Sequence, residues 1–209
     1  MDFPFSGFFR PRSGMTRRRI LATGLGGVLA PALAACSGGA ALDSFDLTAV
    51  SAGRGVAIAR GQLVVSEPIA SPPTDSDRII VRPTPDTLAT LKGAQWVDRL
   101  PRLVQTRLVQ TFENSRLLKS VGRPEAKLQA DYTLSSEIRN FEMDVAGGAA
   151  VVEISVKLVA EKNGRIVAAQ VFSNRIPGSA DQGANAAFAL DQALGQTMQQ
   201  IVAWTASRI

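Results

Sequence analysis

The sequence ADYTLSSEIRNFEMDVAGGAAVVEISVKLVAEKNGRIVAAQVFSNRIP, residues 130–177, carries the most regular pattern in this chain. Apolar and polar side chains alternate through three runs, which indicates β-strands with one buried face. Gly147-Gly148 separates the first two runs, and Asn163-Gly164 separates the last two. Asn-Gly between alternating runs is a strong hairpin signal, because both turn positions then need positive φ. The sequence therefore predicts a three-stranded antiparallel meander over 130–177.

A pattern with a helical period precedes the meander. From Gln95 onward, apolar residues recur at steps of three or four, which is typical of one face of an amphipathic helix. Trp96 lies on this face and is expected to be a core or interface anchor. Pro101 also lies within the run and is unfavourable inside a helix. The helix therefore either begins near Leu100 or is distorted there, and we favour a continuous helix with a distorted first turn.

A second long helix is predicted at 181–207. Apolar residues from Phe188 to Val202 recur there at helical spacing, with alanines between them. Ser179 or Asp181 can cap the first turn of this helix.

Shorter alternating runs upstream predict further strands at 44–50, 63–66 and 78–82. The last is expected to be an edge strand, because Pro83 and Pro85 follow it and cannot donate to a ladder. Together with the helices, these strands predict an α+β fold, with an antiparallel β-sheet and two long helices packed on one of its faces.

The N-terminal segment has the layout of a signal peptide. Three arginines precede an uncharged, mostly apolar run at 20–35, which is shorter than the roughly 20 residues that span a bilayer. The run ends in Leu33, Ala34, Ala35 and Cys36, which resemble a bacterial lipobox. In that signal the cysteine thiol receives a diacylglyceryl group and becomes the mature N-terminus. Each buried CH₂ contributes about 0.8 kcal/mol, so a cysteine with two or three acyl chains is a stable anchor.

These signals divide the chain into a signal peptide at 1–35, a lipidated tether at 36–43 and a folded domain at 44–209. A true start at Met15 would shorten the signal peptide, and its arginines fit either general or twin-arginine export. Ser37 follows the cysteine, and its resemblance to enterobacterial sorting signals, in which an aspartate there implies retention in the inner membrane, implies the outer membrane. We therefore expect a periplasm-facing lipoprotein in the outer membrane of a Gram-negative bacterium.

The composition excludes several function classes. The chain has 209 residues, a formal charge of +5, no histidine and one cysteine. The missing histidine excludes a Ser-His-Asp triad, a Cys-His pair and an HExxH zinc site. One cysteine excludes an intrachain disulfide and a thiolate metal cluster. Five arginines precede Cys36, so the mature chain is nearly neutral and is not expected to bind nucleic acid.

The charged residues that could serve as catalytic groups are each expected to have a non-catalytic role. The carboxylate pairs Asp75 with Asp77 and Glu142 with Asp144 are expected to be solvated turn residues, which stay ionised and make poor acid–base pairs. Arg82 is expected to keep an edge strand soluble. We predict no catalytic residue, no metal ligand and no cofactor other than covalent lipid on the cysteine. The protein is therefore predicted not to be an enzyme.

The order of motifs in GQLVVSEPIASPPTDSDRIIVRPTPDTLATLKGAQWVDRLPRLVQTRLVQTFENS, residues 61–115, resembles the ABC-type transport auxiliary lipoproteins, the group with PqiC- and YmbA-like members. A proline-broken loop follows one strand, RIIVR forms the next, and Trp96 opens a helix that ends in LVQTFENS. The similarity continues through the meander and covers about 45–206. The chain departs from members with a Pro-Xaa-Tyr-Leu turn, since it has Pro68-Ile69-Ala70-Ser71 there.

The resemblance implies an auxiliary docking subunit of an MCE/ABC-type system that moves phospholipid or other hydrophobic molecules between two membranes. Its partners would be an MCE-domain protein and the ABC permease of the same system, with phospholipid as a further candidate ligand. Two other classes stay open. One is a periplasmic lipid-binding carrier, which needs an apolar cavity of about 300 Å³ or more. The other is a lipoprotein activator of a cell-wall enzyme, and a serine hydrolase is a remote further alternative.

Overall fold

The computed structural model describes residues 41–52, 59–127 and 129–209. The predicted signal peptide at 1–35 and its lipobox at 33–36 lie outside the described residues and stay predictions. No helix in the described part of the chain is long and apolar enough to span a membrane.

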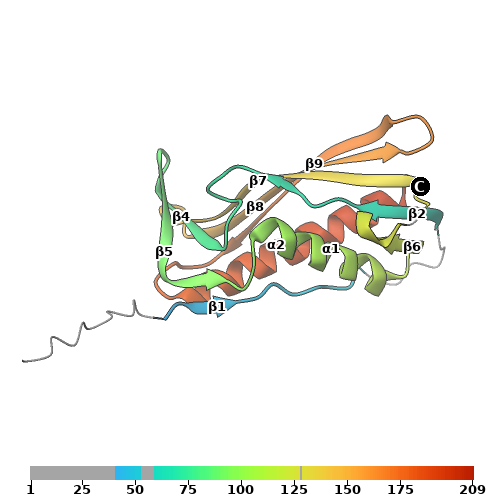
Figure 1. Cartoon of the computed structure of the whole chain (residues 1–209). Helices are drawn as coiled ribbons and strands as arrows, with labels where there is room; N and C mark the ends of the chain where they lie inside the picture. Colours follow the sequence, from blue (N-terminus) through green and yellow to red (C-terminus); the bar gives the residue numbers. More distant parts are fainter. Residues whose placement is uncertain (1–40, 53–58, 128) are drawn as a thin grey trace, which may run out of the picture. The chain divides into compact units, whose positions relative to one another are not determined.

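The predicted meander is confirmed. It consists of β7 (Tyr132–Asp144), β8 (Ala149–Ala160) and β9 (Arg165–Pro177), paired antiparallel in chain order. Its inward face is apolar, as in the register partners Ile138, Ile154 and Phe172, all three buried. Both helices lie on that face of the sheet (Figure 1).

The turn between β8 and β9 differs from the expected tight turn. It has four residues, 161–164, and the Gly164 amide donates to the Ala160 carbonyl at 2.9 Å. Only Gly164 has a positive φ, of 66°, so the expectation that Asn163 shares it was wrong. The strand pattern stops at Ala160, and the longer loop lets one glycine close the turn.

The predicted α+β class with two helices is confirmed. The sheet is mixed, however, so the prediction of an antiparallel sheet was wrong. Three earlier strands pair with β7 in parallel: β2 (Ala59–Val65), β3 (Ile69–Ala70) and β4 (Arg78–Thr84). A helix lies between these strands and β7 in the chain, and parallel neighbours require such a crossover connection.

The strand β4 is not an edge strand, because β5 (Thr87–Trp96) pairs with it on the side away from β7. The run Ile79, Ile80 and Val81 is buried throughout, which is typical of an interior strand. Pro83 is tolerated because it follows the last residue of β4 that pairs with β7.

The first helix, α1 (Leu100–Ser115), begins at Leu100 with Pro101 in its first turn. The favoured continuous helix from Gln95 was therefore wrong, and the later start is confirmed. Trp96 instead ends β5, where its amide donates to the Asp77 carbonyl at 2.7 Å. The fixed φ of proline suits a first helical turn, so this residue marks the start.

Two short elements after α1 were not expected from the sequence. The strand β6 (Leu118–Gly122) pairs in parallel with β2, and the 3₁₀ turn η1 (Pro124–Ala126) leads toward β7. Five residues are too few to establish an alternating pattern, so β6 gave little signal.

The second helix, α2 (Gly183–Ala206), packs against β8 and β9. Phe188 was expected on its buried stripe but is 64% exposed, because the stripe is formed by the residues around Ala186, Leu190 and Leu194. The predicted caps were also wrong: Gln182 is the N-cap residue and makes no side-chain capping bond.

The N-terminal segment of the domain lies against the helices. The strand β1 (Asp43–Phe45) pairs in parallel with the end of β5 and is shorter than the predicted strand at 44–50. Beyond it, the Thr48 amide and hydroxyl donate to the Asp191 carboxylate of α2 at 2.7 and 2.6 Å. The Val50 amide donates to Thr111 of α1 at 3.3 Å. These bonds end the strand early by turning the chain onto both helices.

Candidate binding site

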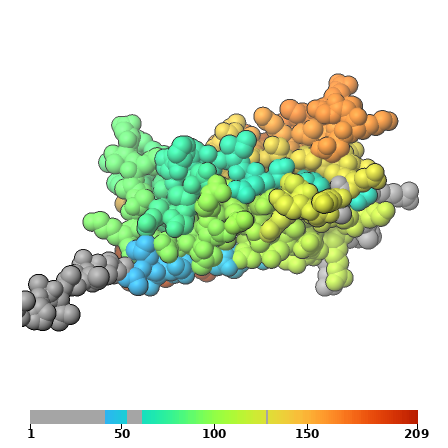
Figure 2. Space-filling view, in the orientation of Figure 1, coloured from blue at the N-terminus to red at the C-terminus, as the bar shows by residue number. Residues whose placement is uncertain are grey.

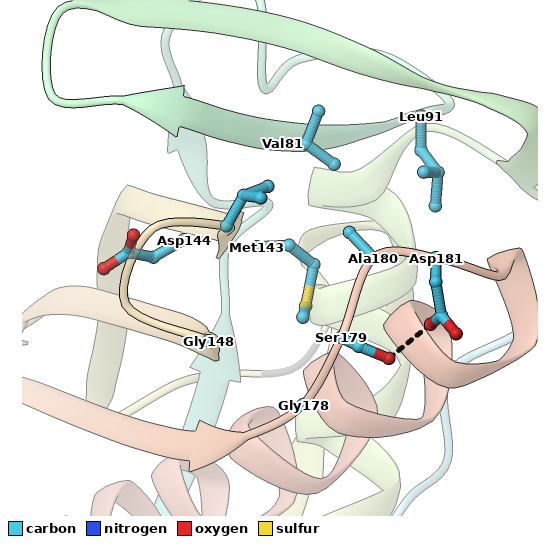
Figure 3. A pocket seen from close by; sticks show the side chains of 10 residues that line it. Val81, Leu91, Met143, Asp144, Gly148, Gly178, Ser179, Ala180 and Asp181 are labelled. Atoms are coloured by element: carbon cyan, nitrogen blue, oxygen red, sulfur yellow. Dashed lines mark hydrogen bonds between the residues drawn. The ribbon is translucent and has the colours of Figure 1, made fainter.

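A hollow of about 440 Å³ lies at one end of the sheet (Figure 3). Its walls come from the middle of β4 and β5, the end of β7, the turn before β8, and the loop from β9 to α2. We call it the end hollow. Its lining is mainly apolar and consists of Val81, Leu91, Met143, Asp144, Val145, Gly148, Gly178, Ser179, Ala180 and Asp181.

An irregularity in the β4–β5 hairpin opens this hollow. Between the pairs Arg78–Gln95 and Ile80–Thr90, β5 has more residues than β4, so β5 bulges away from its partner. Gly93 lies in the bulge with a φ of 75°, a conformation that favours glycine. Leu91 of the same bulge lines the end hollow.

The opposite wall depends on a close approach at Gly178, in the loop that follows β9. A Cβ at this position would lie 2.6 Å from the Cβ of Ala189 and 3.4 Å from the Cε of Met143. Glycine therefore lets the loop run close to α2 and β7. The side chains of Ser179, Ala180 and Asp181 follow directly and line the end hollow (Figure 3).

Two carboxylates line this site. Asp144 accepts from Arg175 at 2.5 Å and from the Gly147 amide at 2.8 Å, and these bonds hold its pKa below the ordinary value. Asp181 accepts from the Ser179 hydroxyl and from Asn185, which also lower its pKa. Both groups are therefore ionised at neutral pH. A general acid–base pair needs pKa values pushed apart, and these two shift in the same direction.

Glu142 is not the solvated turn residue that was predicted. It is buried near the end of β7 and pairs with Arg82 of β4 through two bonds, of 2.6 and 3.0 Å. The carboxylate raises the pKa of Arg82, whose guanidinium also donates to the Pro85 carbonyl. Because β4 is interior, this arginine joins two strands instead of making an edge soluble.

The pH dependence of stability tests the Asp144 interaction. Because the folded-state pKa is lowered, the ionised group stabilises the fold fully above the unfolded-state value of about 4. That stabilisation is lost as pH falls through the folded-state pKa. The unfolding free energies of wild type and Asp144→Asn, measured in urea from about pH 6 to about pH 2.5, should therefore converge in acid. A difference that is constant across this range would contradict the prediction.

A second surface feature lies at the free edge of the meander. In the described part of the chain, β9 pairs only with β8, so its other edge carries unpaired backbone groups. Ile166, Val167 and Val171 on this strand are 56%, 50% and 42% exposed. The hairpin formed by β8 and β9 projects from the body of the domain (Figure 2, orange). Long edge strands with exposed apolar side chains are normally protected by a covering element.

The four residues of the predicted lipobox lie outside the described residues: Leu33, Ala34, Ala35 and Cys36. Within residues 41–52, 59–127 and 129–209, no group of three or more Asp, Glu, His or Cys side chains is arranged to hold a metal ion. Sequence reasoning missed the end hollow; of the glycines that line it, Gly148 was recognised as a turn signal and Gly178 was not.

Comparison with known proteins defines the family. Residues 45–202 match the family described as ABC-type transport auxiliary lipoprotein component. The chain belongs to this family. The assignment expected from the order of motifs is thus confirmed, and the match covers the described domain from β1 into α2.

The chain also resembles solved structures. A crystal structure from Xanthomonas campestris is 32% identical, has a TM-score of 0.72, and the match covers 78% of this chain and 95% of that chain. Another solved structure, of an uncharacterized protein, is 14% identical and has a TM-score of 0.64. The match covers 79% of this chain and 99% of that chain, and at this identity it shows only that the fold is shared.

A curated relative from Bradyrhizobium diazoefficiens, described as an uncharacterized protein, is 30% identical over 144 residues. The match covers 68% of this chain and 39% of the relative. The chain therefore spans about two fifths of the length of this relative.

Proposed function

We propose that the auxiliary lipoprotein is anchored by lipid at Cys36 to the outer membrane and docks an MCE-domain protein together with its ABC permease. The system would move phospholipid or another hydrophobic molecule between the two membranes. Family membership supports a role beside an ABC transporter. Ser37 after the cysteine supports the outer membrane.

The free edge of β9 is the observation that carries the docking role. A partner strand or loop can pair with its open backbone groups, while Ile166 and Val171 supply apolar contacts. A lipid anchor raises the local concentration of the domain at the membrane, so such a contact need not be strong on its own.

A pull-down from cross-linked, detergent-solubilised envelope tests this proposal. The tagged lipoprotein should recover an MCE-domain protein and a permease, identified by mass spectrometry. Val171→Glu places a charge on the free edge and should reduce that recovery at least about tenfold, which corresponds to about 1.4 kcal/mol. Ile69→Glu, on an exposed side chain of β3 away from this edge, is the matched control and should recover the same proteins as wild type.

Three results would overturn the proposal. One is the absence of transporter subunits from the recovered proteins. Another is recovery of a cell-wall synthase in their place, which would favour the activator alternative. The third is undiminished recovery by Val171→Glu, which would remove the edge as the docking surface.

A further inference from the structure

Two elements that contribute to the end hollow also contact β1, the strand that follows the tether. Asp43, the first residue of β1, pairs with Ala94, and Leu91 of the hollow precedes Ala94 on the same strand. A Cβ on Gly183 would lie 2.7 Å from the Cβ of Ala94, so the start of α2 also packs here. Asp181 of the hollow comes just before that start. The strand β5 and the segment that leads into α2 thus each contribute to the hollow and also reach β1.

The length of the tether limits how far this end of the domain can move from the membrane. Six residues lie between Cys36 and Asp43, so the connection has seven Cα–Cα steps and spans at most about 25 Å when fully extended. A lipid on Cys36 would therefore keep Asp43, at the start of β1, within this distance of the bilayer surface. The turn between β8 and β9 lies at the other end of β8, about 40 Å away along a strand of 12 residues.

The chemistry of the hollow fits part of a lipid. Its volume of about 440 Å³ falls in the range of small-molecule sites. Val81 and Met143 form a buried apolar wall, and Val145 is 48% exposed at the side. Asp181 adds an ionised carboxylate, and within the described residues no lysine or arginine forms an ion pair with it. An apolar chain joined to a cationic amine would complement both features.

We propose that the end hollow binds one acyl chain of an amine-bearing phospholipid, such as phosphatidylethanolamine, taken from the bilayer that carries the anchor. This inference rests on the lipid anchor of the proposed function, and it does not depend on which transporter subunit docks. Asp181 faces the amine of the headgroup, and the apolar lining covers the chain. Bound lipid would thus lie against elements that also contact β1, the strand that follows the tether.

Photolabelling in vesicles tests the site directly. The full lipidated protein is reconstituted in vesicles of phosphatidylethanolamine and phosphatidylglycerol that contain a trace of phosphatidylethanolamine with a diazirine in one acyl chain. After illumination, adducts are mapped by mass spectrometry. They should concentrate on the peptides that contain Leu91, Met143 and Ala180. Because the photoreactive group is carried only by the phospholipid, an adduct cannot arise from the lipid on Cys36.

Variants separate a filled hollow from general membrane contact. Ala180→Trp fills the space and Val145→Gln makes its lining polar, so each should reduce labelling at least fivefold. Val167→Gln makes the same kind of change on β9 and should label as wild type. Circular dichroism of each variant establishes that it is folded before labelling. A diazirine probe with a phosphatidylglycerol headgroup should label less than the first probe, and Asp181→Asn should remove that difference.

The outcomes are decisive in both directions. Adducts spread equally over Ile166, Val171 and the hollow, or unchanged in Ala180→Trp, would overturn the site. Equal labelling by the two headgroups in wild type would overturn the role of Asp181. An unlabelled hollow that cross-links to a protein in whole envelope would make it a protein-docking site instead. Because the vesicles contain no transporter, failure here leaves the pull-down result standing, and the reverse also holds.

Discussion

Replacement of Trp96 by alanine is expected to lower the free energy of unfolding by about 4 kcal/mol. Trp96 is 1% exposed at the end of β5, and its ring meets Phe141 of β7 edge to face, with centroids 5.9 Å apart. Its removal would leave a cavity in the core and delete an aromatic pair. Domains of this size are stable by only about 5–15 kcal/mol, so the variant would lose a large share of its stability.

Urea unfolding followed by circular dichroism measures this loss. Trp204→Ala is the matched control, because Trp204 also makes an edge-to-face pair, with Phe172, but is only partly buried. Its loss should be less than half that of Trp96→Ala. A loss below about 1 kcal/mol for Trp96→Ala would mean that the site collapses around the smaller side chain.

Replacement of Cys36 by alanine is expected to abolish lipid attachment. The thiol is the proposed acceptor of the diacylglyceryl group, and the chain has no other cysteine. Without acyl chains, the protein loses about 0.8 kcal/mol of membrane affinity for every CH₂ that would have been buried. Incorporation of labelled palmitate in growing cells should fall to background.

Ser37→Ala is the control for this experiment, because it changes the next residue and leaves the thiol in place. It should incorporate palmitate as wild type does. Continued labelling of Cys36→Ala would contradict the lipobox assignment, and the membrane-proximal position of the end hollow would then lose its support.

The meander could be predicted because its information is local. Alternation over β7, β8 and β9 is long enough to define strands, and glycines separate them. The partners of β7 on its other side could not be predicted, because a period of two identifies a strand but not its neighbour. For the same reason β4 was wrongly predicted to be an edge strand. Its unbroken run of buried residues was the signal for an interior strand.

The end hollow was beyond sequence reasoning for a different physical reason. Its walls come from Leu91, Met143 and Ala180, which are far apart in the chain and meet only through the sheet register and the start of α2. Glycine patterns predicted turns but not the space between them. By contrast, the lipobox is a local signal, so the sequence predicts Cys36 as a lipidation site even though the structure does not describe it.

The bonds between Thr48 and Asp191 have a consequence for how the chain matures. They join residues 143 positions apart, so the first segment of the domain is fixed by its last helix. Contacts of such long range slow folding, since a large loop must close before they form. A nascent chain would hold its complete structure only after α2 has been synthesised. We therefore expect the domain to remain incompletely folded until late in its biogenesis. Until then the chain could cross a membrane as an extended polypeptide.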